Sequence, residues 1–292
     1  MSGGPRSIVA AYNGTEACQV AVRRAAALSL RMGATLRIAS VQAVTPVVGS
    51  TAWAVPYEPL GPTQDAVRKR AHEGAALVQE AVDAVPHALF GAPPVEIVRL
   101  AKEAGAVLIV LGSSPRSALE RFLLGATADR ILRLSPVPCL VAASPHVAQR
   151  LLVAVDDSLH GARALRVALR HAAATGAEVR CVHVVPAPPP GERGRRELED
   201  SLPKVRQFLD TFVDSMRAEA AAEGPVPEVV AAVRAGAVGK EILLEAEACE
   251  ADLIVAGTHG RGFLQRAILG STSEHLLHNA RTSLLIVPAS EE

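Results

Sequence analysis

The sequence predicts an α/β protein of two similar halves, each with a doubly wound parallel sheet and helices on both faces. Short apolar runs alternate with longer, alanine-rich segments of helical periodicity, which is the pattern of parallel βαβ units. The same series of segments starts again at an offset of 143 to 145 residues. A glycine-bearing segment, 257–272, follows a strand and leads into a helix, an arrangement typical of a phosphate-binding loop.

The first half contains apolar runs that we interpret as strands. In chain order they are 7–13, 35–41, 86–90, 107–111 and 137–142. The segments between them have apolar residues at helical spacing, and we expect helices at 16–32, 63–85, 95–105 and 128–134. Residues 43–62 form a loop rich in Pro and Gly, whose Trp53 and Tyr57 could contribute a lid or a partner contact.

The second half repeats this series in order, spacing and residue type. Gly176-Ala-Glu-Val-Arg180 corresponds to Gly33-Ala-Thr-Leu-Arg37, and Leu253-Ile-Val-Ala-Gly257 corresponds to Leu108-Ile-Val-Leu-Gly112. Because order, spacing and residue type agree together, we interpret the chain as one internal duplication.

The join between the halves falls near 145–150, so we expect one domain at 1–146 and a second at 147–292. The least matched part of the second half is its connector, where we expect a loop at 186–195 and one helix at 196–223.

Composition favours a soluble protein of two ordinary domains. Of the 292 residues 49% are hydrophobic and only 3% aromatic, which suits alanine-rich helices packed closely on sheets of Val, Ile and Leu. Lys+Arg and Asp+Glu both number 30, so nothing indicates a nucleic-acid or membrane partner. The four cysteines stand singly and the apolar N-terminal run is too short for a signal peptide, so we expect a cytoplasmic protein.

The glycine-bearing segment has the properties of a phosphate cradle. Gly257 and Gly260 let the backbone turn tightly and bring N–H groups against an anion. Gly270 and Ser271 stand at the expected start of a helix, where unpaired N–H groups and the helix dipole favour negative charge. The alternative is an ordinary strand–turn–helix in which the glycines serve only the turn.

On these residues the sequence resembles the universal stress protein family in its tandem two-domain form. The motif of that family is Gly, two residues, Gly, nine residues, Gly, then Ser or Thr, and it is matched by Gly257, Gly260, Gly270 and Ser271. Two further features of the family are an aspartate that ends the first strand and a His-Val pair that ends the second, matched by Asp156 and by His183-Val184. The likeness covers nearly the whole chain, twice.

The resemblance implies that the second half binds ATP, together with Mg²⁺. Asp156 would hydrogen-bond the ribose or lie at the edge of the adenine pocket, and Val184 would offer backbone groups to adenine. The ATP-binding residues in this interpretation are Asp156, Val184, Gly257, Gly260, Arg261, Gly270, Ser271 and Thr272.

The first half departs from this motif. Pro115 occupies the position of the second glycine and Ala126 that of the Ser or Thr, so one N–H donor and one hydroxyl are lost. Asn13 stands in place of the aspartate, without its charge. We therefore expect the first site to be weak or empty, with the weaker candidate residues Asn13, Val41, Gly112, Gly125 and Thr127.

The histidines have simpler interpretations than metal ligation. His275 and His278 are three apart on an expected helix, but no third ligand is near in sequence, so we expect surface side chains and assign no metal ligand to the protein. His259 could contact phosphate or face solvent, and His183 is expected to pack at the end of its strand.

The leading functional hypothesis is an ATP-binding stress protein that acts as a nucleotide-dependent sensor or regulator with an unknown regulatory protein partner. No GxxxxGK[ST] motif occurs, Lys240 lies outside the loop and no general base is identifiable, so hydrolysis is expected to be slow at most.

Three other classes of protein compete with this hypothesis: a nucleotide-activating enzyme, an NAD-binding protein and a nucleotide-free interaction protein. A nucleotide-activating ligase or nucleotidyl transferase would carry a glycine-rich loop after the first strand, which Asp156-Asp-Ser lacks, and the glycine order does not fit an NAD-binding site. A nucleotide-free interaction or scaffold protein remains open.

The resemblance also implies the architecture. We expect two tandem five-stranded parallel sheets in the order 3-2-1-4-5, a Rossmann-like fold similar to the adenine nucleotide alpha hydrolases. The halves are expected to pair through their last strands, at 140–142 and 285–287, which would cover two exposed sheet edges. One chain would then imitate a dimer of single-domain relatives, and a further homodimer is possible.

Overall fold

The computed structural model describes residues 6–44, 63–113, 124–222, 224–258 and 269–289. The elements of the first half are β1 (Ser7–Ala11), α1 (Glu16–Met32), β2 (Thr35–Gln42), α2 (Gln64–Ala76), β3 (Ala84–Phe90), α3 (Pro93–Glu103), β4 (Ala106–Gly112), α4 (Ala126–Leu134) and β5 (Cys139–Ala142). Those of the second half are β6 (Arg150–Ala154), α5 (Leu159–Thr175), β7 (Glu178–Pro186), α6 (Glu192–Ala221), β8 (Val229–Gly236), α7 (Val238–Ala248), β9 (Leu253–Gly257), α8 (Ser271–Asn279) and β10 (Ser283–Val287).

In this part of the chain the strands form one continuous ten-stranded sheet in the order β3-β2-β1-β4-β5-β10-β9-β6-β7-β8. Each half has the expected order 3-2-1-4-5 and pairs its strands in parallel. The halves meet where β5 pairs antiparallel with β10, with Leu285 opposite Leu140. The expected pairing through the last strands is therefore confirmed, and it joins the two five-stranded sheets into one.

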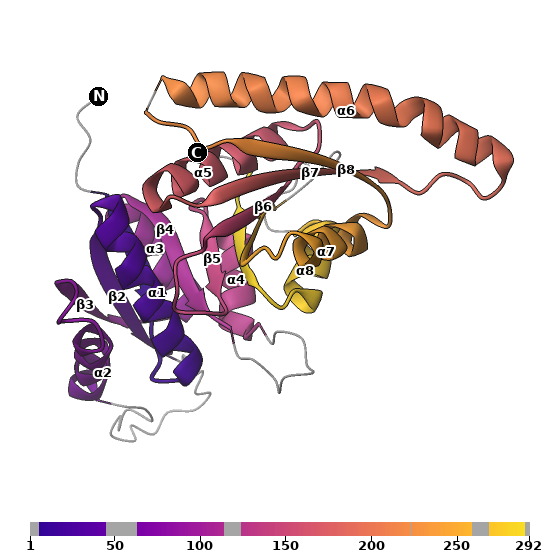
Figure 1. Ribbon diagram of the computed structural model, residues 1–292. Coiled ribbons are helices and arrows are strands. Elements are labelled where there is room, and N and C mark those ends of the chain that lie inside the picture. The colour runs from indigo at the N-terminus through magenta and orange to yellow at the C-terminus, as the bar shows by residue number, and fades with distance from the viewer. Residues whose placement is uncertain (1–5, 45–62, 114–123, 223, 259–268, 290–292) are drawn as a thin grey trace, which may run out of the picture.

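Two apolar cores lie on the two faces of this sheet. The helices that contribute to them can be followed in Figure 1. Successive residues of a strand point to opposite faces, so Ile8 of β1 belongs to one core and Val9 to the other. Apolar residues of α1, α5 and α6 pack in the first core, and those of α3, α4, α7 and α8 pack in the second. Many of the packing residues are alanines, such as Ala21 and Ala25 of α1, which let helices approach the sheet closely.

Two sequence-based boundaries were wrong by more than two residues. The helix expected at 63–85 ends at Ala76, because the following residues from Ala84 pair with β2 instead, where Pro86 has no N–H to support a helix. The loop expected at 186–195 is too long, since α6 begins at Glu192. In the first turns of α6, side chains four residues apart form ion pairs such as Arg193–Glu197, with an N–O distance of 2.9 Å. Such pairs stabilise a helix.

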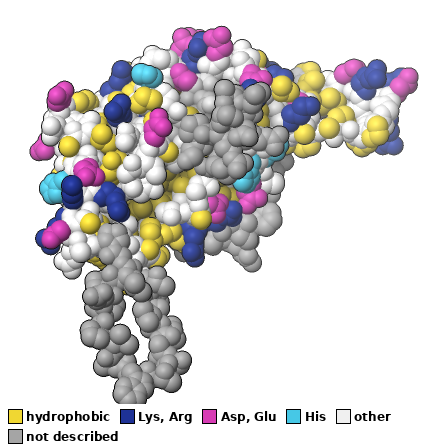
Figure 2. Space-filling view, turned by 90° about the horizontal axis from the view of Figure 1, so that it is seen from below, with side chains coloured by type: hydrophobic (Ala, Val, Ile, Leu, Met, Phe, Trp, Pro, Cys, Tyr) yellow, Lys and Arg dark blue, Asp and Glu magenta, His cyan; other side chains and the backbone are white. Residues whose placement is uncertain are grey.

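Helix α6 extends beyond the sheet at its N-terminal end (Figure 1). Figure 2 shows Lys or Arg and Asp or Glu side chains mixed on this projecting end. Towards its C-terminal end, where α6 contacts β8 and α5, Leu209, Val213 and Met216 are buried. Among the described helices none is both long enough and apolar enough to cross a membrane.

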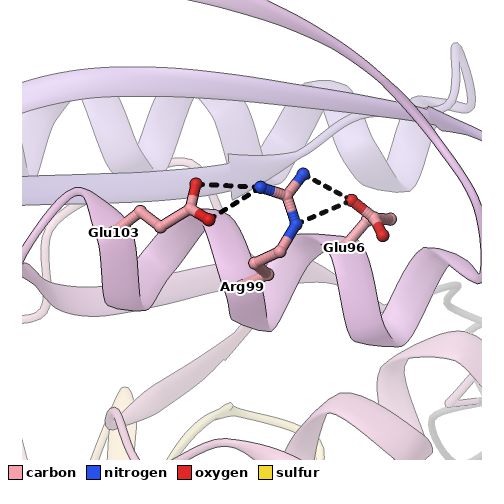
Figure 3. Close-up of polar contacts among 3 residues, drawn as sticks. All are labelled: Glu96, Arg99 and Glu103. Atoms are coloured by element: carbon pink, nitrogen blue, oxygen red, sulfur yellow. Dashed lines mark hydrogen bonds and ion pairs between the residues drawn. The ribbon is translucent and has the colours of Figure 1, made fainter.

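The halves differ in one charged cluster on equivalent helices. On α3, Arg99 binds Glu96 and Glu103 at the surface, with N–O distances of 2.6 and 2.7 Å (Figure 3). On α7 the cluster is deeper, because Glu245 has only 7% of its side chain exposed and binds both Arg180, at 3.0 Å, and Arg234, at 2.7 Å. The first half has Leu100 at the position of Glu245.

Glu245→Ala is expected to lower the free energy of unfolding by about 2 kcal/mol, because two arginines then lose a buried partner while remaining partly solvated. Glu103→Ala is the matched control on α3, and removing that exposed pair should cost less than about 0.5 kcal/mol. Urea denaturation of both variants measures the difference. Equal losses for the two variants would show that burial of Glu245 has no energetic consequence.

Candidate phosphate-binding site

The candidate site lies at the carboxyl ends of β9, β6 and β7, which are neighbours in the sheet. From β6 the chain continues into α5, whose apolar residues pack in one core, and from β9 it continues towards α8, which packs in the other. The chain therefore leaves two adjacent parallel strands towards opposite faces. In open α/β sheets this reversal opens a crevice at the carboxyl ends, where ligands bind.

Asp156 lies in the turn between β6 and α5. Its Oδ1 accepts hydrogen bonds from the backbone N of Ser158, at 3.2 Å, and from Ser158 Oγ. Ser158 in turn is the N-cap of α5 and accepts from the backbone N of Gly161, at 3.2 Å. Within the described part of the chain, Asp156 Oδ2 has no hydrogen-bond donor. The turn therefore fixes the carboxylate through one oxygen, Oδ1.

Gly161 is a residue of this turn that the sequence interpretation missed. A Cβ atom at this position would lie 2.5 Å from the carbonyl oxygen of Asp156, which is closer than real Cβ contacts. Glycine is therefore needed for the first turn of α5 to approach the Asp156 turn. The first half has Cys18 here, so motif comparison between the halves gave no signal for it.

The connection between β9 and α8 is closed at both of its ends. The backbone N of Gly270 donates to the carbonyl of Thr258, at 2.7 Å, and Ser273 Oγ donates to the carbonyl of Gly257, at 2.6 Å. Gly270 is the N-cap of α8, so Ser271 and Thr272 are its first two residues. These bonds bring the end of β9, with Gly257, close to the start of α8, with Gly270, Ser271 and Thr272. Gly260, Arg261 and His259 lie outside the described residues.

Ser273 is a second residue that the sequence interpretation missed. Its side chain is buried and its hydroxyl ties the end of β9 to the first turn of α8. Ala128 stands at the equivalent position of the first half, so that half has no hydroxyl there. The exchange of Ser for Ala between the halves marks this position in the sequence, but it does not reveal the contact that the hydroxyl makes.

Val184 lies near the end of β7 and is buried. Val182 faces β6, since its carbonyl accepts from the backbone N of Val155, at 3.0 Å. Backbone groups in a strand alternate in direction, so those of Val184 also point to the β6 side. The last residue of β6 paired with β7 is Ala154, opposite Val182, and Val184 therefore presents its backbone beyond the end of β6.

His183 is half-buried beside this position. Its Nδ1 lies 3.0 Å from the carbonyl oxygen of Val155, so the ring connects β7 to the turn that carries Asp156. This contact is consistent with the expectation that His183 packs at the end of its strand.

In the equivalent turn of the first half, the Asn13 side chain accepts the same two hydrogen bonds as Asp156, but its second polar group differs. Asn13 Oδ1 accepts from the backbone N of Thr15, at 3.1 Å, and from its Oγ1, at 2.7 Å. With Oδ1 used in this way, the remaining polar group of Asn13 is an NH₂ donor, whereas Asp156 keeps a charged acceptor. The two halves therefore present opposite hydrogen-bonding groups at the same place.

The other first-half candidates are also described. Val41 lies near the end of β2, and Gly112 packs so closely on the backbone of Ala17 that a Cβ could not be added without movement. Gly125 and Thr127 are exposed at the start of α4. Pro115 lies outside the described residues.

The paired histidines of α8 are both exposed, which confirms the expectation of surface side chains. The ring of His275 lies against Gly239 of α7, where a Cβ would come within 2.5 Å of it. Among the described residues, no group of three or more His, Cys, Asp or Glu side chains could hold a metal ion.

The model of the universal stress protein family matches the chain twice, over residues 5–143 and 148–288. A universal stress protein of Mycobacterium tuberculosis is 30% identical over 216 residues, which cover 69% of this chain and 68% of that protein. One of Thermus aquaticus is 35% identical over 137 residues, 47% of this chain and 96% of that protein. The crystal structure of a universal stress protein from Archaeoglobus fulgidus superimposes with a TM-score of 0.66 at 21% identity, covering 98% of each chain. The chain therefore belongs to the universal stress protein family and carries two copies of its domain in tandem.

Proposed function

We propose that this protein binds ATP with Mg²⁺ in its second half and acts as a nucleotide-dependent sensor or regulator in the stress response. The observation that carries the proposal is the closed β9–α8 connection, in which Ser273 and Gly270 hold the end of β9 against the start of α8. Unpaired N–H groups and the helix dipole at such a helix start favour phosphate. Members of the family bind nucleotides.

The proposal assigns further contacts around this connection. Asp156 would accept a hydrogen bond from a ribose hydroxyl through Oδ2, and Val184 would meet adenine through its backbone. Gly257, Gly270 and Ser271 would contact the phosphates, together with Gly260 and Arg261 of the motif. Mg²⁺ would enter with the phosphates, and no protein ligand is assigned to it.

We propose different roles for the two domains, 1–146 and 147–292. The first would bind nucleotide weakly or not at all, because Asn13 offers a donor where Asp156 offers a carboxylate, and Ala126 and Pro115 replace motif residues. It would instead pair with the second domain through β5 and β10.

The protein is proposed to signal rather than to turn over substrate, with slow ATP hydrolysis at most. Proteins of the family are typically non-catalytic nucleotide-binding proteins. A cytoplasmic location is proposed from the four cysteines, which are all free thiols. A regulatory protein and a second copy of the chain are the proposed macromolecular partners.

Ser273→Ala is expected to weaken binding of Mg·ATP about fivefold, because the loss of one buried hydrogen bond, about 1 kcal/mol, loosens the β9–α8 connection. Equilibrium titration measures the affinity. Ala128→Ser is the matched change in the first half and should leave the affinity unchanged. An unaltered affinity in Ser273→Ala would show that this hydroxyl does not prepare the site.

The proposed function is tested by the nucleotide that the protein retains through purification. The protein is denatured and the supernatant is separated by ion-pair chromatography, while a parallel sample is followed for phosphate release. We expect about one ATP per chain and no multiple turnover at ordinary enzyme rates, above about 1 s⁻¹. Retention of no nucleotide, with no binding on titration, would favour the nucleotide-free interaction protein instead.

A further inference from the structure

A second candidate site is a cleft of ≈ 1280 Å³ where the two halves meet. It is lined by the C-terminal ends of α1, α3 and α6, by much of α5, by the residues before β1 and β5, by the start of β4 and by Leu285 of β10. None of the described residues assigned to ATP lines it. The cleft is therefore a separate feature of the molecule.

The charged side chains that line the cleft are all cationic. Among its described lining residues there is no Asp or Glu. The cations come from elements far apart in the chain, namely Arg6, Arg31, Lys102, Arg163 and Arg170. Arg31 Nη1 donates to the carbonyl of Thr175, at 2.6 Å, at the C-terminal end of α5, and Arg163 and Arg170 also have interactions of their own. Such a concentration of one sign of charge in a concave surface attracts anions.

The floor of the cleft is apolar. Leu108, Leu169 and Leu285 are almost fully buried there, whereas Arg6, Arg31 and Lys102 are exposed. The lining thus combines apolar side chains at depth with positive charge at the rim, which suits a molecule with an apolar body and an anionic group.

His171 adds a polar group to the deep part of the lining. It is 4% exposed, and its Nε2 has no hydrogen-bond partner among the described residues. Nε and Nη2 of the buried Arg24, whose charge acts on His171, are also without partners in the described part of the chain. Buried polar atoms without partners are uncommon in native proteins and point to a bound group or water that completes them.

The cations of this cleft are not required by the fold. The equivalents of Arg6, Arg31 and Lys102 in the other half are Gln149, Ala174 and Glu247. The duplicated elements therefore form with neutral or acidic residues at the same places. The charge has arisen at one of two structurally equivalent sets of positions.

We propose that this cleft binds a small organic anion, with a phosphate or carboxylate group at Arg31 and Lys102 and an apolar body over Leu108 and Leu285. The ligand would bridge the two halves, since Arg31 and Lys102 belong to the first and Leu285 to the second. Its occupancy would therefore add to the contacts that hold the halves together.

Calorimetric titration with decyl phosphate, below its critical micelle concentration, tests this proposal. The protein is used as the full chain, both as wild type and as Asp156→Ala, so that binding at the ATP site is recognised. We expect saturable binding in both proteins. Inorganic phosphate, which lacks the apolar body, and decanol, which lacks the charge, should each bind at least about tenfold more weakly. Decanoate in place of decyl phosphate shows which anionic group is preferred.

The double variant Arg31→Glu/Lys102→Glu should weaken decyl phosphate binding at least about tenfold, because the rim attraction becomes repulsion. Arg68→Glu/Lys69→Glu, on the exposed surface of α2, is the matched double charge change and should have no effect. If the double variant does not fold, Arg6→Glu takes its place and should also weaken binding of decyl phosphate. Unsaturable binding, or equal affinity in wild type and the rim variants, would overturn the proposal and leave the cations as helix-capping residues.

Discussion

Asp156→Asn is expected to weaken binding of Mg·ATP at least about tenfold. The carboxylate oxygen that would accept a charge-assisted hydrogen bond from the ribose becomes an NH₂ group, which can only donate. The change reproduces the first half, where Asn13 Oδ1 accepts the same two bonds that Asp156 Oδ1 accepts in the second. The turn should therefore keep its conformation and the protein its stability. Equilibrium titration of the purified variant, with its unfolding curve as a check, measures both quantities.

Asn13→Asp is the reciprocal control. It places a carboxylate in the first-half turn, but Pro115 and Ala126 still interrupt the motif, so ATP binding should not change by more than about twofold. If Asp156→Asn left the affinity unaltered, Asp156 would serve only to cap α5. If Asn13→Asp changed the affinity for Mg·ATP more than Asp156→Asn did, the ATP site would lie in the first half instead of the second.

Stability is expected to fall as pH falls from about 6.5 to about 4, through the buried His171. Burial, together with the positive charge of Arg24, lowers the pKa of His171 to about 4. In the unfolded chain His171 has the ordinary histidine pKa of 6.5. Between this value and the folded value, the unfolded chain binds a proton that the folded protein does not, so the free energy of unfolding decreases as pH decreases. Over this window the loss is about 3 kcal/mol, and above it His171 is neutral in both states and contributes nothing.

His171→Leu isolates this contribution, because the first half has Leu28 at the equivalent position. Urea denaturation of wild type and variant between pH 7 and pH 4 gives the difference in slope, in which the carboxylates common to both proteins cancel. The variant should lose less stability than the wild type as pH falls. Parallel pH profiles would mean that His171 is protonated in the folded protein without cost.

Most of the fold could be predicted because the relevant signals are periodic and occur twice. The alternation of apolar runs with helical segments identified the strands, and the repeat at an offset of 143 to 145 residues identified the halves. The helix boundary after Ala76 could not be read locally, since 77–83 keep a helical pattern and only pairing with β2 draws Ala84–Phe90 into the sheet. Local propensity is overridden here by tertiary contacts.

The candidate site was predictable where a residue type carries its own chemistry. Glycines before a helix start indicated the phosphate loop, whereas the ribose contact of Asp156 was implied only by the resemblance to the family. Ser273 and Gly161 were missed because their roles depend on neighbours in space. A buried hydroxyl that reaches Gly257, and a missing Cβ beside Asp156, are visible only when three segments are folded together.

The most direct test of the central claim is the number of Mg·ATP sites per chain, measured by calorimetric titration of nucleotide-free protein. We predict one site, which is lost in Gly257→Ala/Ser271→Ala and retained in the first-half variant Gly125→Ala/Thr127→Ala. Two sites per chain would contradict the assignment of ATP to the second half, and one site that survives Gly257→Ala/Ser271→Ala would contradict the β9–α8 connection as its phosphate cradle.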